Sequence, residues 1–80
     1  MTLDRIRTWF EDGVRMKATH LLVVCDTFDY TFYPVLSMPG EDVTSLILTR
    51  DEMTMTRVEE VYDLSLPMES QIAESRAWHT

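Results

Sequence analysis

Apolar residues recur every three or four positions in the first segment of the chain, and charged residues occupy most of the positions between them. This spacing is typical of an amphipathic helix, for which Thr2 is a suitable N-cap. We predict a helix over about 3–17, in which Gly13 either permits close packing or marks early fraying. The apolar positions are Leu3, Ile6, Phe10 and Val14.

A continuous apolar run replaces the helical spacing at Leu21–Cys25. A run this short and rich in β-branched residues is typical of a strand in the centre of a sheet. We predict a strand over 20–25, a hairpin turn over 26–32 and a second strand over 33–38. Because Pro34 has no N–H group to donate, the second strand is expected at an edge of the sheet.

The second half of the chain contains two helical patterns and one ambiguous segment. Acidic residues precede the first pattern, which predicts a short helix over about 41–50. Residues 54–64 fit either a helix or a strand, and we predict a strand because threonines and alternating apolar residues favour it. A proline in the first turn suits the start of a last helix, predicted over about 66–77.

These elements predict one α+β domain over 1–80, since the chain is too short for a second core. The predicted order is α-β-β-α-β-α, with a three-stranded antiparallel sheet in the strand order 2-1-3 and helices covering one face. The other face would then expose apolar side chains, and a homodimer would bury them. The apolar candidates for that interface are Leu22, Val24, Leu36 and Met38.

Acidic residues outnumber basic residues by fourteen to seven, which gives a net charge of -7. This charge repels phosphate and anionic lipid, so we expect no direct binding of nucleic acid and no membrane association. No apolar run approaches the roughly 20 residues that span a bilayer. The start of the chain has no signal-peptide pattern and the single cysteine, Cys25, has no internal partner, so a cytoplasmic location is expected.

Candidate catalytic and metal-binding residues are few. Asp26 and Asp29 could hold a divalent cation or exchange protons, but aspartates at such a position more often stabilise a turn. His20, Cys25 and His79 lack the close pairing of a zinc site, and the two glycines do not form a phosphate-binding loop. We therefore predict a protein with no enzymatic activity, no metal and no cofactor.

Four aromatic residues fall within six positions around the predicted hairpin. Aromatic side chains bury a large area with few rotatable bonds, and they often anchor protein interfaces. We expect Phe28 to enter the core and Phe32, near a tight turn, to be the exposed anchor. The predicted partner-binding surface comprises Phe32, Tyr30, Tyr33, Asp29 and Asp26.

Several blocks of the sequence resemble a family of small proteins from phage and prophage genomes that has no assigned activity. The resemblance implies a host or phage protein as the partner and the host cytoplasm as the location. Thr31, Phe32 and the segment 46–56 depart from the family's usual pattern. The matching blocks are ATHLLVVCDTFDY at 18–30, YPV at 33–35, PGED at 39–42, VYDLSL at 61–66 and RAWH at 76–79.

From these observations we predict a non-enzymatic accessory protein that binds a host or phage protein and modulates or inhibits it. Three alternatives remain open: a small metal-dependent enzyme, a protein that binds a small ligand or nucleotide, and an acidic mimic of DNA. Mimicry is the weakest of these, because arginines interrupt the negative field along the chain.

Overall fold

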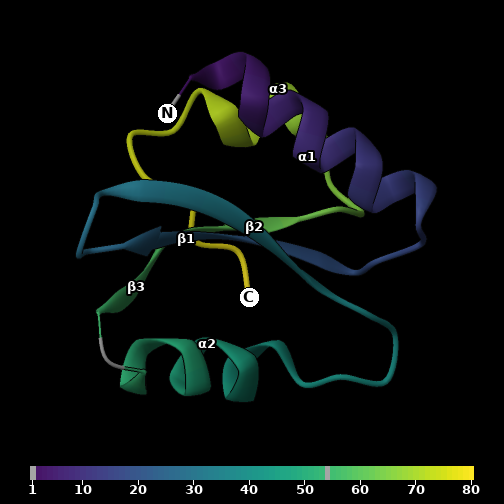
Figure 1. The fold of residues 1–80 in the computed structure, drawn as a ribbon. Helices are drawn as coiled ribbons and strands as arrows, with labels where there is room; N and C mark the ends of the chain where they lie inside the picture. Colours follow the sequence, from purple (N-terminus) through teal and green to yellow (C-terminus); the bar gives the residue numbers. More distant parts are fainter. Residues whose placement is uncertain (1, 54) are drawn as a thin grey trace.

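The computed structural model describes residues 2–53 and 55–80. Within them, the three strands form one antiparallel sheet in the order β2-β1-β3 (Figure 1). The predicted fold class, element order and strand order are therefore confirmed. The elements are α1 (Leu3–Arg15), β1 (His20–Asp26), β2 (Thr31–Ser37), α2 (Val43–Glu52), β3 (Thr56–Asp63) and α3 (Met68–Ile72).

The central strand β1 pairs along its whole length with both neighbours. It runs from His20, opposite Ser37 of β2 and Asp63 of β3, to Asp26, opposite Thr31 and Thr56. Its five inner residues are all buried, which is why the apolar run has no polar alternation. Pro34 lies on the edge strand β2, as predicted.

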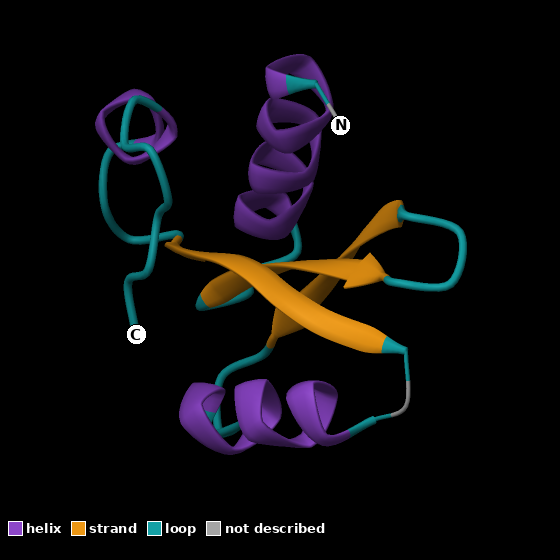
Figure 2. Ribbon diagram, turned by 90° about the vertical axis from the view of Figure 1, so that its left-hand side faces the viewer, coloured by secondary structure: helices purple, strands orange, loops and turns teal. Residues whose placement is uncertain are grey.

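Helices cover both faces of the sheet, which corrects the prediction of one covered face. Helices α1 and α3 lie on one face and α2 lies on the other (Figures 1 and 2). The reason is the sequence of β1, because alternate residues of an uninterrupted apolar strand point to opposite faces and both sets need burial. One core comprises Ile6, Phe10, Leu21, Val23, Tyr62, Ile72 and Ala77, and the other Leu22, Val24, Val43, Ile47, Val58 and Val61.

Because helices cover both faces, the sheet formed by the described residues has no open apolar face of the kind that the predicted homodimer would bury. Leu22 and Val24 are buried beneath α2, while Leu36 packs against the core on the α1 face. The four residues proposed for one interface therefore do not share an open surface.

The packing of α1 decides the role of Gly13. A Cβ atom built on Gly13 would lie 2.7 Å from Cδ1 of Leu64 and 3.0 Å from Cδ2 of Leu36. Helix α1 continues to Arg15, two residues beyond the glycine. Gly13 thus permits close packing of α1 onto the sheet, which is the first of the two predicted alternatives.

The last helix is shorter than the predicted 66–77. It ends at Ile72, after which the chain returns to the outer edge of β3. Val61 N–H donates to the Ala77 carbonyl at 2.9 Å, and His79 N–H donates to the Val61 carbonyl at 2.9 Å. A helix through residue 77 could not make these bonds. The strand predicted over 54–64 is confirmed from Thr56, and its first predicted position, Thr54, lies outside the described residues.

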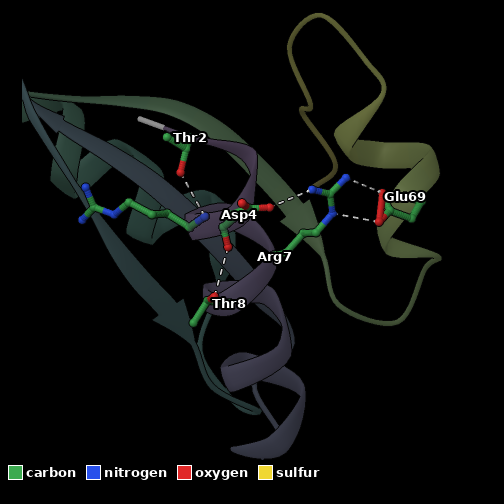
Figure 3. Close-up of polar contacts among 6 residues, drawn as sticks. Thr2, Asp4, Arg7, Thr8 and Glu69 are labelled. Atoms are coloured by element: carbon green, nitrogen blue, oxygen red, sulfur yellow. Dashed lines mark hydrogen bonds and ion pairs between the residues drawn. The ribbon is translucent and has the colours of Figure 1, made fainter.

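Long-range polar contacts attach α3 to its neighbours. Arg7 of α1 donates from Nε to Glu69 Oε1 at 2.8 Å, and also contacts Asp4 at 3.3 Å (Figure 3). Gln71 is buried, with Oε1 accepting from Asp63 N–H and Nε2 donating to the Asp63 carbonyl, each at 2.8 Å. Gln71 therefore satisfies both backbone groups at the end of β3.

Candidate protein-binding surface

The turn between β1 and β2 is built by two aspartates. Asp26 Oδ1 accepts from Phe28 N–H at 2.9 Å. Asp29 Oδ1 accepts from Thr31 N–H at 3.1 Å and from the Thr31 hydroxyl at 2.7 Å, and these bonds hold the pKa of Asp29 below its usual value. Both carboxylates thus perform the turn-stabilising role that the sequence had offered as the ordinary alternative to a metal or proton-transfer site.

The structure reverses the expected roles of the aromatic residues. Phe28 is 75% exposed and Tyr30 is 72% exposed, whereas Phe32 is half-buried against the α1 core and Tyr33 against the α2 core. The predictions of a buried Phe28 and an exposed Phe32 anchor are therefore wrong. The cause is the length of the turn, because β2 begins at Thr31 and Phe32 is already a strand residue opposite Cys25.

A second loop contributes apolar side chains at the same end of the sheet. Thr27 N–H donates to the Met55 carbonyl at 2.8 Å, which ties the hairpin turn to the loop between α2 and β3. Met53 is 45% exposed and Met55 is 52% exposed. Both loops lie at one end of the molecule in Figures 1 and 2. We call the four exposed side chains the tip patch: Phe28, Tyr30, Met53 and Met55.

The backbone of the tip patch is unusual for residues of this size. Tyr30 has φ of 58° and Met55 has φ of 63°, both in the left-handed region that bulky residues seldom adopt. A glycine or asparagine would take up this conformation more easily. Large apolar side chains thus occupy two positions where neither the backbone nor the core requires them.

Acidic residues outnumber basic residues around the tip patch, where Arg50 in the last turn of α2 contacts Met53 Sδ from Nη1 at 3.9 Å. Asp26 and Asp29 lie in the turn itself, and Asp51 and Glu52 lie in the last turn of α2. Arg57 on β3 is paired with Glu59, whose Oε1 accepts from Arg57 Nε at 2.6 Å. The tip patch is therefore an apolar surface with an acidic border.

The remaining candidate residues do not assemble into a metal or catalytic site. Cys25 is a buried free thiol near one end of β1, while His20 lies at the other end and has the opposite parity. His79 lies in the C-terminal segment, where Nε2 is 2.6 Å from Glu74 Oε2. Among the described residues, no three His, Cys, Asp or Glu side chains are grouped closely enough to hold a metal ion.

Comparisons with known proteins do not indicate a function for this surface. Searches against protein-family models, curated proteins and solved structures found no match. In the described part of the chain, no helix has the length and apolar character needed to cross a membrane.

Proposed function

We propose that the chain is a non-enzymatic protein-binding factor whose contact surface is the tip patch, and that it modulates a host or phage protein, as the resemblance to phage proteins implies. The observation that carries the proposal is the exposure of Phe28 and Tyr30 on a turn fixed by its own hydrogen bonds. Tyr30, Asp29 and Asp26 of the predicted surface are retained, while Phe32 and Tyr33 are replaced by Phe28 and the two methionines.

The energetic argument rests on area and rigidity. An aromatic side chain can bury about 150–250 Å² in an interface, and each Å² of apolar area removed from water contributes about 25 cal/mol. Binding through a flexible loop would lose much of this gain to ordering of the backbone. Here the bonds from Asp26 and Asp29 hold the turn before any partner arrives. The tip patch is thus prepared for binding at a small entropic cost.

The shape and charge of the tip patch indicate the kind of partner. A hairpin turn projects from the sheet, so it fits a concave apolar pocket on a folded protein. The acidic border favours basic side chains around that pocket. A second copy of this chain carries the same net charge of -7 and the same acidic border, so self-association through the tip patch is disfavoured.

The proposal is tested by quantitative affinity capture from lysates of the source cells. The wild-type chain is compared with a tip variant carrying Phe28→Ser and Tyr30→Ser, and with Leu48→Ser, which changes an apolar residue of α2 that is 56% exposed. We expect a specific protein that binds wild type and Leu48→Ser alike, and that binds the tip variant at least about 30-fold more weakly.

Two results would contradict the proposal. The first is a bound protein whose affinity is unchanged by the tip variant, because the contact must then lie elsewhere. The second is equal loss of binding in Leu48→Ser, which would indicate general stickiness of apolar residues. Circular dichroism of all three proteins establishes that they are equally folded.

A further inference from the structure

A hollow of about 400 Å³ lies at the opposite end of β1 from the tip patch. Its apolar lining comes from the end of α1 and the segment after β3, and its polar lining from the residues where β1 begins and β3 ends. The apolar residues are Val14, Ala18 and Leu64, and the polar ones Thr19, His20, Asp63 and Ser65. This volume and mixture of surfaces are typical of small-molecule sites, and we call it the strand-end hollow.

The hydrogen bonds of Thr19 determine which nitrogen of neutral His20 carries the proton. The Thr19 hydroxyl donates its single proton to the Ser37 carbonyl at 3.1 Å. Toward His20 Nδ1, at 3.0 Å, the same hydroxyl can therefore only accept. The proton of the neutral ring is thus on Nδ1, and Nε2 is an acceptor. This Nε2 is buried and has no hydrogen-bond partner among the described residues.

Asp63 contributes a carboxylate to the wall of the hollow. It lies directly opposite His20 in the sheet, and its Oδ1 accepts from Ser65 N–H at 2.9 Å and from the Ser65 hydroxyl at 2.6 Å. Burial opposes ionisation of Asp63, but the bonds from Ser65 and the fields of His20 and His79 outweigh it, so the pKa of Asp63 is lowered. The carboxylate is therefore negatively charged at neutral pH.

We propose that the strand-end hollow binds a small organic ammonium ion, with its charged nitrogen beside Asp63 and His20 and a short apolar chain over Val14, Ala18 and Leu64. The wall offers the Asp63 carboxylate, which creates a negative potential in the hollow. No lysine or arginine is among the lining residues to oppose a cation. The net charge of -7 attracts cations to the molecule as a whole.

The experiment uses the full chain labelled with ¹⁵N and titrated with n-butylammonium chloride to tens of millimolar at constant ionic strength. Sodium butyrate and n-butanol are matched probes with the opposite charge and no charge. We expect saturable amide shifts at Ala18, His20, Leu64 and Ser65 with butylammonium. Butyrate should produce none, and butanol should bind about tenfold more weakly because it lacks the charge.

Two variants with the same change in charge provide the decisive comparison. Asp63→Asn keeps an acceptor for Ser65 but removes the charge beside the hollow, and it should weaken butylammonium binding about tenfold. Asp29→Asn removes a charge from a turn with the same pattern of bonds at the other end of the sheet, and it should leave the affinity unchanged.

Three outcomes would overturn the proposal: no saturable shifts with butylammonium, equal binding of butanol, or equal weakening by both variants. Phe28→Ser, which alters the tip patch alone, should bind butylammonium like wild type. The proposal for the strand-end hollow and the proposal for the tip patch are therefore tested independently of each other.

Discussion

The two ends of the central strand use the same local device for different purposes. At each end an aspartate accepts from the N–H and hydroxyl groups of the residue two positions later, in Asp29 with Thr31 and in Asp63 with Ser65. Asp29 stands on an exposed turn whose aromatic residues point into solvent. Asp63 stands beside a hollow and shares its surroundings with two histidines.

The two ends differ in the distance along the chain between the polar groups that form hydrogen bonds. Around the hairpin turn, the hydrogen bonds of the aspartates join residues two positions apart. The turn is therefore stabilised by its own residues, and its aromatic side chains are free for other contacts. At the other end, Gln71 bonds to Asp63 from eight residues away and Thr19 bonds to Ser37 from eighteen. The tip patch is thus locally determined, whereas the strand-end hollow exists only when the end of α1, the start of β1 and the end of β3 are packed together.

The largest expected effect comes from removing the long-range bonds at the hollow end. Gln71→Leu keeps the volume of a buried side chain but leaves Asp63 N–H and carbonyl without their partner. We expect a loss of about 3 kcal/mol in the free energy of unfolding, measured by urea denaturation. Asp29→Asn at the tip keeps a side-chain oxygen that can accept from Thr31, so it should lower the midpoint much less than Gln71→Leu does. Similar midpoints for both variants would contradict the contrast between the two ends.

The next largest effect is a difference in stability between alanine variants of two phenylalanines that lie four positions apart. Phe32→Ala removes a ring that packs on the α1 core and should lower the free energy of unfolding by about 2 kcal/mol. Phe28→Ala removes an exposed ring and should change it by less than about 0.5 kcal/mol. Thermal melting of the two variants measures this directly. If Phe28→Ala lowered the melting temperature more than Phe32→Ala, the assignment of Phe32 as the buried ring would be contradicted.

Acid should weaken the fold through both aspartates, with a different sensitivity to salt. The pKa values of Asp29 and Asp63 are lowered in the folded chain, so their stabilisation is complete above about pH 5 and is lost as the pH falls through the folded-state values. At Asp63, burial raises the pKa, hydrogen bonds from Ser65 lower it, and the fields of His20 and His79 lower it further; at Asp29, hydrogen bonds from neutral Thr31 dominate and no histidine contributes.

Unfolding of wild type, Asp63→Asn and Asp29→Asn between pH 3 and 6, at low and at about 1 M salt, measures the two contributions. The difference in the free energy of unfolding between wild type and Asp63→Asn should become smaller at high salt. The corresponding difference between wild type and Asp29→Asn should stay the same. Equal salt sensitivity would mean that the histidines have no influence on Asp63.

The smallest effect concerns the backbone of the tip. Tyr30→Gly relieves a left-handed residue and should raise the free energy of unfolding by up to about 0.5 kcal/mol, while removing one aromatic side chain from the tip patch. Urea denaturation measures the gain. A loss of more than 1 kcal/mol would show that the Tyr30 side chain supports the fold and is not free for a partner.

Periodicity along the chain was sufficient to predict the elements that depend on local pattern. The helical spacing from Leu3, the apolar run of β1 and the position of Pro34 predicted α1, the central strand and the edge strand. Even the ambiguous segment after Thr54 was correctly predicted as a strand. These predictions hold because the burial of each element follows its own sequence.

The site was less predictable, because it depends on a shift of one or two residues in the hairpin turn. The sequence located the cluster of aromatic residues, but the start of β2 at Thr31 decided that Phe32 faces the core. Alternate residues of a strand point to opposite faces, and turn residues leave the sheet altogether. A small error in the length of the turn therefore exchanges the buried and exposed rings.

By itself, the sequence determined the α+β class, the strand order and the aromatic character of the hairpin. Only the tertiary structure decided that α2 covers the second face, that α3 ends at Ile72, and that His20 and Asp63 lie side by side at a hollow. The physical reason is the distance along the chain, since these features join residues that no local pattern relates. Burial of both faces of β1, and satisfaction of the backbone groups at the end of β3, bring them together.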